Sequence, residues 1–206
     1  MNHGSASVTE ATNVAIEPSQ LVLTPSEEPH VEHQRLIEDW SMIKHQEGGY
    51  FKETDRSPFT MTVGEQTMSV TPDHGENTVE RNYSTLIYYL LTSNSPVGKL
   101  HKNKNRIIHI LQRGKGQYVL IHPDGSIKSF RVGFDYANGE VSQWVVPGGV
   151  YKASFLIPND EFNNGLLISE VVVPGFSFDD HMFMPDYTTL QQLVGNDNAT
   201  KLAFLL

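Results

Sequence analysis

The stretch GKLHKNKNRIIHILQRGKG, residues 98–116, places His101 and His109 on either side of a basic connection. His109 lies inside the apolar run IIHIL. A strand-like run, TLIYYLL, precedes the stretch at residues 85–91, and QYVLI follows a Gly-Lys-Gly turn at residues 117–121. Short apolar runs separated by turn residues are typical of β-strands. Two histidines in the wall of such a β-rich structure predict a ligand cavity.

Turn residues divide the following part of the chain into further short strands. Asp124-Gly125 and Asn138-Gly139 are strong hairpin signals. The expected strands are residues 126–133, 141–146, 151–157 and 166–173. Strands at this spacing, with no helix between them, indicate an antiparallel sandwich or barrel. Two short helices, expected at residues 188–194 and 199–205, would cover one end of it.

The part of the chain before the first strands is less regular. Residues 1–33 are rich in Ser, Thr, Glu and Pro and show no sustained period, which predicts a mobile tail with one short strand at 21–23. Apolar residues at helical spacing predict an amphipathic helix over residues 32–44, ended by Gly48 and Gly49. The polar residues 60–81 predict a long surface excursion, built as a β-hairpin over the mouth of the fold.

Composition excludes several classes of protein. With 38% hydrophobic and 19% charged residues, the 206-residue chain has the make-up of an ordinary globular domain. Its net charge of −9 argues against nucleic-acid binding, which needs clustered lysine and arginine. The lack of cysteine excludes disulfides and thiolate chemistry, and no apolar run approaches the roughly 20 residues that span a bilayer. Because the first residues lack the features of a secretory or mitochondrial leader, we expect a cytoplasmic protein that also enters the nucleus by diffusion.

Four motifs give the chain a recognisable pattern. They are EGGYFKET at residues 47–54, STLIYYLL at 84–91, VVPGGVY at 145–151 and VPGFSFDD at 173–180. In this order they resemble a family of small single-domain cupins found in bacteria and in fungi, including budding yeast, whose activity is unassigned. The resemblance covers residues 34–206. It implies an all-β, mainly antiparallel fold, the cupin double-stranded β-helix or jelly roll, with a few short helices, an internal small-molecule pocket and a homodimer.

The two general cupin motifs can be placed on the chain residue by residue. The first usually carries two histidines one residue apart, a glutamate and a glycine; the second carries a proline, a glycine and a later histidine. The matching positions are Gly98, His101, Gly116, Pro147 and Gly149. Asn103, Arg106 and Lys152 or its neighbours stand where the family has a second histidine, the glutamate and the last histidine.

These departures weaken the expected metal site. A mononuclear iron or manganese site needs about three or four converging nitrogen and oxygen ligands. The sequence offers His101 and His109 beside the cationic Arg106. The resemblance therefore implies a pocket without metal or cofactor, used for binding or for acid–base work. Metal-free jelly rolls of the wider fold include deoxysugar-nucleotide epimerases, which use a histidine base and a tyrosine acid.

Four residues are candidates for catalysis, and each has a simpler alternative role. His109 and His101 have a pKa range suited to proton transfer, but a core position and a solvated loop explain them equally well. Glu53 follows the Gly-Gly-Tyr turn and is expected to point into the barrel, unless it forms a salt bridge with Lys52, Arg56 or Arg81. Tyr88 and Tyr89 alternate across one strand, so one of them faces inward; we assign Tyr88 as the candidate acid.

Ligand-binding candidates are aromatic or polar residues of the motifs and of the basic connection: Tyr50, Lys99, Arg106, Gln117, Trp144, Tyr151 and Lys152. Aromatic rings can wall a flat ligand, and cations can hold a phosphate or carboxylate, although core packing and solvation also account for them. Asp179, Asp180 and His181 follow the Pro-Gly-Phe turn. They suggest a metal site, but capping and dimer contacts are the favoured interpretation.

Three functions remain open at this point. The favoured hypothesis is a metal-independent isomerase or epimerase of a carbohydrate or sugar phosphate, in which His109 and Glu53 act on one proton. The second is a non-catalytic binder of a sugar or nucleobase. The third is a metal-dependent cupin enzyme with an unusual ligand set. The sequence does not select a substrate.

Overall fold

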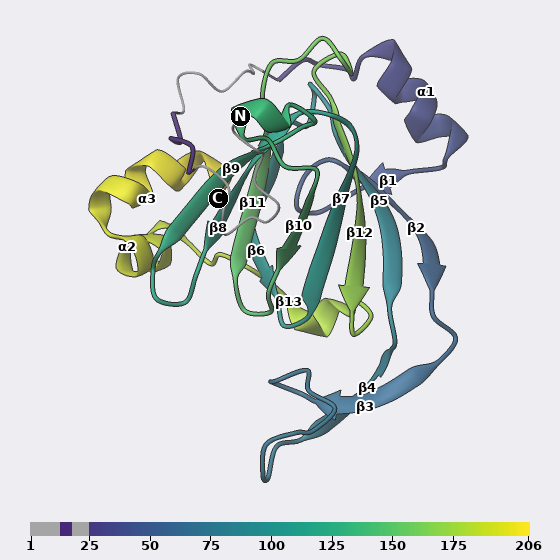
Figure 1. The fold of residues 1–206 in the computed structure, drawn as a ribbon, viewed down its shortest axis with the longest axis vertical. Helices are drawn as coiled ribbons and strands as arrows, with labels where there is room; N and C mark the ends of the chain where they lie inside the picture. Colours follow the sequence, from purple (N-terminus) through teal and green to yellow (C-terminus); the bar gives the residue numbers. More distant parts are fainter. Residues whose placement is uncertain (1–12, 18–24) are drawn as a thin grey trace.

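Two antiparallel sheets face each other in the computed structural model, which describes residues 13–17 and 25–206 (Figure 1). The six-stranded sheet has the order β1 (Ile43–Lys44), β2 (Tyr50–Arg56), β5 (Thr85–Leu91), β12 (Leu166–Val173), β7 (Arg106–Gly114), β10 (Gln143–Val146). The five-stranded sheet has the order β13 (His181–Phe183), β6 (Val97–Asn103), β11 (Tyr151–Leu156), β8 (Gly116–Ile121), β9 (Ile127–Val132). The predicted jelly roll is confirmed.

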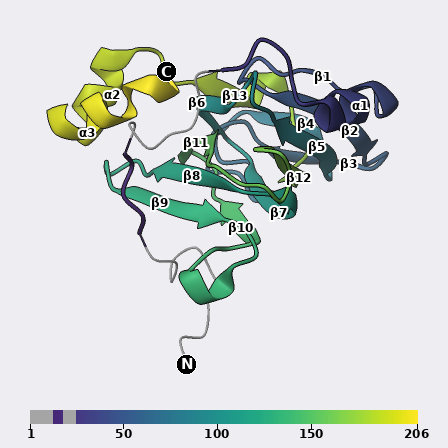
Figure 2. The same ribbon diagram turned by 90° about the horizontal axis from the view of Figure 1, so that it is seen from above.

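Three α-helices of the described residues lie outside the sheets. Helix α1 (Val31–Asp39) packs on the outer face of the six-stranded sheet, where Leu36 and Ile37 contact a buried cluster around Phe162. Helices α2 (Tyr187–Val194) and α3 (Asn196–Leu202) cover the outer face of the five-stranded sheet (Figure 2). Short 3-10 turns occupy Tyr136–Asn138, Phe178–Asp180 and Ala203–Leu205. None of the helices in residues 13–17 and 25–206 is long and apolar enough to cross a membrane.

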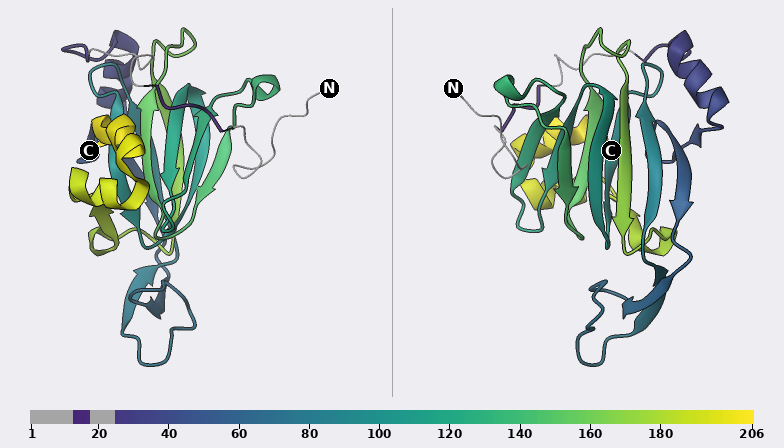
Figure 3. Two further views of the ribbon diagram at one scale, coloured as in Figure 1. Left: turned by 90° about the vertical axis from the view of Figure 1, so that its left-hand side faces the viewer. Right: turned by 45° about the vertical axis from the view of Figure 1, so that its right-hand side comes forward.

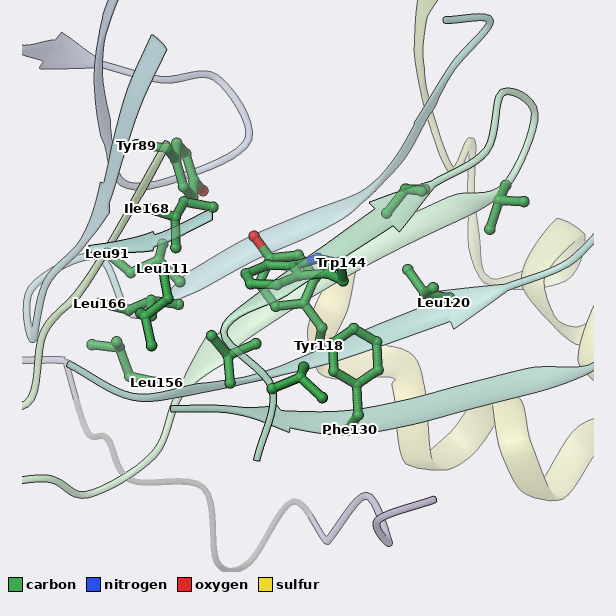
Figure 4. Close-up of a cluster of buried hydrophobic side chains, with 14 residues drawn as sticks. Tyr89, Leu91, Leu111, Tyr118, Leu120, Phe130, Trp144, Leu156, Leu166 and Ile168 are labelled. Carbon is green, nitrogen blue, oxygen red and sulfur yellow. The ribbon is translucent and has the colours of Figure 1, made fainter. Parts of the chain in front are cut away.

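The main core fills one end of the space between the sheets. Figure 4 shows Tyr118, Phe130 and Trp144 gathered there, with aliphatic side chains of both sheets around them. The rings of Tyr118 and Trp144 meet edge to face, with centroids 4.6 Å apart, a favourable geometry for aromatic pairs. Because this end is packed with apolar side chains, polar side chains of the same inner faces are left to gather at the other end.

Three details differ from the sequence-based expectation. The helix expected over residues 32–44 ends at Asp39, because Ser41 adopts a left-handed conformation (φ 51°) and the chain turns into β1. The basic connection that contains His101 is a strand, β6, in which Lys99 and Lys102 flank the buried Leu100 and His101. Residues 13–17 run beside β9, where the Val14 amide donates to the Ser129 carbonyl. The strand expected at 21–23 lies outside the described residues.

The polar excursion forms a hairpin, β3 (Thr60–Gly64) and β4 (Thr78–Asn82), that projects away from the barrel (Figure 1). Its base is fastened by a bidentate ion pair between Arg81 and the fully buried carboxylate of Asp180, with N–O distances of 2.7 and 2.9 Å. Planar guanidinium–carboxylate pairs of this kind fix geometry as well as charge. The pair therefore holds the turn before β13, and with it His181, against the barrel.

Candidate functional site

One row of side chains crosses the inner face of the six-stranded sheet. Strand register places Glu53 of β2 beside Ile87 of β5, Ile87 beside Glu170 of β12, Glu170 beside His109 of β7, and His109 beside Trp144 of β10. Residues directly opposite on antiparallel strands project on the same face. Glu53 and His109 thus belong to one inner row, but Ile87 and Glu170 stand between them.

Lys152 reaches this row from the opposite sheet. Its Nζ lies 2.8 Å from Glu170 Oε2 and 2.9 Å from His109 Nε2, and the side chain is 4% exposed. Because an ammonium has no lone pair, His109 Nε2 must be the acceptor of the second hydrogen bond. An ammonium buried beside a carboxylate is stable only while the pairing is intact. The three residues therefore form one charged unit that joins the two sheets.

The imidazole of His109 and the two tyrosines nearest the ion pair, Tyr89 and Tyr118, are neutral. Burial lowers the pKa of His109 well below its usual value of 6.5, and the neighbouring Lys152 charge lowers it further. The ring of His109 also stacks on Trp144, with centroids 5.0 Å apart. Burial raises the pKa of Tyr89 and of Tyr118 well above the usual value of 10.0, so both are neutral phenols. His109 is thus placed to orient Lys152 from behind.

A second cluster lies on the other side of Lys152. Glu47, in the turn before β2, accepts a hydrogen bond of 2.7 Å at Oε1 from His181 Nε2 of β13. His101 Nε2 of β6 approaches the same oxygen to 3.2 Å. The Glu47 turn is fixed by its backbone, because the Lys99 amide donates to the Glu47 carbonyl and the Tyr89 hydroxyl to the Gly48 carbonyl. Burial lowers the pKa of His101 to about 3, although Glu47 opposes the shift.

A cavity of about 330 Å³ opens onto both clusters. Its floor carries Glu47, Tyr89, Lys152 and Glu170, and its rim carries Glu53 and Arg56. Its lining is otherwise mostly apolar and aromatic, with a few polar residues: His45, Phe51, Thr85, Ile87, Asn103, Ile107, Val172, Phe176, Ser177 and Phe178. The volume is at the lower end of the range found for small-molecule sites. No residue of 60–82 lines it within the described chain, so the hairpin is not its lid.

The structure separates the residues that the sequence suggested for catalysis. His101 lies beside Glu47 and outside the cavity lining, and His109 lies behind Lys152, the one suggested ligand-binding residue that reaches the floor. Glu53 lies at the rim, where it forms an ion pair of 2.8 Å with Arg56, one of the partners considered for it. Tyr88 is on the outer face, where its ring packs on Trp40 at 4.6 Å. It is Tyr89 that faces inward.

Most of the suggested ligand-binding residues lie away from the cavity. Tyr50 belongs to the buried cluster under α1, and Gln117 bonds to Ser129 on the outer face of the five-stranded sheet. Tyr151 packs among residues of α2 and α3, beneath the Lys102 ammonium. Three more suggested ligand-binding residues lie away from the cavity. Trp144 is in the core beside His109, and Lys99 and Arg106 are exposed.

Sequence reasoning did not assign Glu47, Glu170, Tyr89 and His181 to the site. Glu170 had a visible signal, since it takes an inward position of the apolar strand LLISEVVV, where a carboxylate needs a partner. Glu47 precedes Gly48 and Gly49, both at positive φ, which marks a constrained turn. His181 was noticed, but nothing in the sequence places it beside a residue 134 positions earlier.

A jelly roll with a charged cavity between its sheets defines a cupin-type barrel. The chain belongs to the family described as Cupin superfamily (DUF985), whose model matches residues 34–184. It is 66% identical over 201 residues to the uncharacterized protein YML079W of Saccharomyces cerevisiae, which covers 98% of this chain and 99% of the yeast protein. The resemblance drawn from the four motifs is confirmed.

Solved structures share the fold. A hypothetical protein from Leishmania major superposes with a TM-score of 0.68 and 24% identity, covering 84% of this chain and 97% of its own. Protein SO0799 from Shewanella oneidensis superposes with a TM-score of 0.65 and 22% identity, covering 84% of this chain and 95% of its own. At these identities the similarity extends to the architecture alone.

Proposed function

We propose that the protein is an isomerase or epimerase of a carbohydrate or sugar phosphate, which moves a proton beside a carbonyl group. The observation that carries this proposal is the Lys152 ammonium, fixed between Glu170 and His109 on the floor of a small-molecule cavity. A preorganised cation at the end of a cavity favours a substrate on which negative charge develops during the reaction. Enolisation of a sugar carbonyl is such a reaction.

Each group of the unit has a defined role in this proposal. An ammonium has three donors, and two are used by Glu170 and His109, which leaves one for the carbonyl oxygen of a substrate. Glu170 lines the same cavity and acts as the base that removes the adjacent C–H proton. The negative charge then passes to the oxygen held by Lys152. Return of the proton to the neighbouring carbon, while the hydroxyl proton of that carbon passes to the oxygen held by Lys152, gives the isomer; a proton delivered by solvent to the other face of the first carbon gives the epimer.

The cavity walls support a sugar-sized substrate. Phe51, Phe176 and Phe178 present aromatic rings, on which the C–H face of a sugar ring can lie. The charged floor and the rim pair of Glu53 and Arg56 offer partners for hydroxyl groups. The mixture of apolar walls with a few convergent polar groups is also what a non-catalytic binder requires. That alternative differs only in leaving the substrate protons untouched.

Solvent exchange separates the two functions. In deuterated water, we expect the protein to place deuterium on the carbon beside the carbonyl of one member of a panel of aldoses, ketoses and their phosphates, followed by proton NMR. Glu170→Gln should lower that rate by a factor of about 100 or more, the usual contribution of a positioned base. Lys44→Met, a change at an exposed lysine of β1, is the matched control. Binding of a panel member without exchange would establish the non-catalytic alternative.

We further propose that the functional unit is a homodimer formed by the outer face of the six-stranded sheet. In Figure 3, helix α1 lies over one end of this face only, and the rest of β5, β12 and β7 has no helix over it. Leu86, Ile108, Ile110 and Val171 project there and are only partly buried, and Val171 is the direct cross-strand neighbour of both Leu86 and Ile108. A contiguous apolar patch on a sheet face is the usual mark of a protein interface.

Ile108→Arg is expected to break this dimer. A charge at the centre of the patch would be buried without a partner on association. Light scattering should therefore give twice the chain mass of 23.1 kDa for the unmodified protein and 23.1 kDa for the variant. The same substitution at the exposed Ile43 of β1 is the control and should leave the dimer intact. A monomer before any substitution would contradict the proposal.

A further inference from the structure

His101 presents an unusual contact inside the barrel. Its Nδ1 lies 2.7 Å from the carbonyl oxygen of Lys99, and since a carbonyl only accepts, Nδ1 must carry the proton. Its Nε2 is buried and makes no hydrogen bond, yet it lies 3.2 Å from the carboxylate oxygen Oε1 of Glu47. In the neutral ring this places a lone pair opposite a negatively charged oxygen. Either a proton on Nε2 or a bound cation would relieve this repulsion.

Two further features limit what this positive group is. The ligand atoms of Glu47, His101 and His181 all lie within 4.8 Å of one another. Atoms bound at right angles to one ion, at about 2.1 Å each, are about 3 Å apart, close to the 2.7 and 3.2 Å found between Glu47 and the two histidines. Protons would have to be placed on both imidazoles to serve the two contacts, whereas one cation bound by the three residues serves both at once.

In contrast to the metal-free pocket expected from the sequence, we propose that Glu47, His101 and His181 bind a divalent first-row transition metal ion. Two histidines and one carboxylate on one side of an ion, with the other positions open, form a common protein site for iron and its neighbours. The open positions would face the cavity, which Glu47 lines. Two of the three ligands, Glu47 and His181, lie outside both cupin sequence motifs, so this site replaces the histidines and the glutamate that those motifs lack.

The surroundings are compatible with such an ion. The Lys99 carbonyl holds the His101 ring through Nδ1, the outer-sphere contact that metal-binding histidines usually make. Lys152 brings a positive charge nearby, but its ion pair with Glu170 balances that charge. Counting Glu47, Glu170 and Lys152, the buried cluster carries two negative charges and one positive charge when its histidines are neutral. A divalent ion would change the net charge of the cluster from −1 to +1, and a singly charged anionic ligand would then bring it to zero.

Cobalt(II) provides a direct test that needs no substrate. Protein freed of metal with a chelator is titrated with Co²⁺, and the visible d–d absorption is followed; Zn²⁺ is then added as a competitor. We expect one Co²⁺ per chain, displaced by Zn²⁺. His181→Ala should weaken Co²⁺ binding by at least about tenfold, because even outer-sphere changes cost 10–100-fold. His181 lies on the edge strand β13 but its side chain is only 4% exposed, so urea denaturation of the variant checks that the fold is retained.

Two controls keep the test decisive. His122→Ala removes a histidine at the β8–β9 turn and should leave Co²⁺ binding unchanged. Glu47→Gln keeps the shape of the side chain but removes its charge, and should weaken binding as His181→Ala does. Equal Co²⁺ affinity in all three variants, or no binding by the unmodified protein, would overturn the proposal. In that case ¹⁵N NMR of the imidazoles would show a proton on His101 Nε2. Because metal binding is read directly, the result is independent of the sugar-exchange experiment.

Discussion

Replacing Lys152 with methionine is expected to lower the free energy of unfolding by about 3–5 kcal/mol, the range found when one partner of a buried ion pair is removed. The pair is buried on both sides, since the side chains of Lys152 and Glu170 are 4% and 9% exposed. Without the ammonium, the Glu170 carboxylate loses its partner although only 9% of its side chain is exposed, and His109 loses the donor at Nε2. Urea denaturation with an unchanged m-value would measure the loss.

A double variant separates the structural role of the ion pair from its chemical role. In Lys152→Met/Glu170→Met both charges are gone and two apolar side chains can pack against each other. Replacing a complete buried pair by apolar residues is often neutral or stabilising, so we expect most of the lost stability to return. Deuterium exchange into the sugar substrate should stay absent. A single Lys152→Met variant that loses less than about 1 kcal/mol would show that the pair is hydrated and that Lys152 is not the fixed cation of our proposal.

Most of the architecture followed from local pattern. Strands 85–91 and 166–173 have the same bounds in the structure as in the sequence-based prediction, because apolar runs between turn residues leave little choice of conformation. Strand β6 was not predicted as a strand, because its lysines at 99 and 102 suggested a solvated connection. Strand β6 is the second strand from the edge of its sheet, where long cationic side chains can reach solvent while Leu100 and His101 are buried. Charged residues alone therefore do not exclude a strand.

The site was harder to predict because its members come from distant parts of the chain. The sequence placed His101 and Lys152 at cupin-motif positions and His109 inside an apolar strand, but it could not show that Lys152 and His109 bond across the barrel. That contact depends on how the two sheets face each other. The assignment of Tyr88 instead of Tyr89 reflects the same difficulty. A one-residue change of register moves a side chain to the other face, and local sequence does not fix which face is inner.

Gly48 links the backbone conformation of the turn before β2 to the position of the Glu47 carboxylate on the cavity floor. Gly48 has φ +104°, a conformation that side chains with a Cβ rarely adopt, and a Cβ there would overlap the backbone carbonyl of Val97. The Gly48 carbonyl also accepts the Tyr89 hydroxyl at 2.9 Å. Any shift that relieves the overlap would break this bond and move the neighbouring Glu47 carboxylate away from His101 and His181.

Gly48→Ala is therefore expected to lower the free energy of unfolding by more than about 2 kcal/mol, because backbone strain of about 1–2 kcal/mol is added to the steric overlap. It should also weaken Co²⁺ binding, although it removes no ligand. Gly75→Ala is the matched control, since Gly75 has φ +84° but open space around its Cβ position. The Gly75→Ala variant should lose only the free energy of unfolding that corresponds to the backbone strain, about 1–2 kcal/mol, and its Co²⁺ binding should be unchanged. Urea denaturation and cobalt titration of the two variants measure both effects, and equal results for them would mean that the Gly48 turn does not position Glu47.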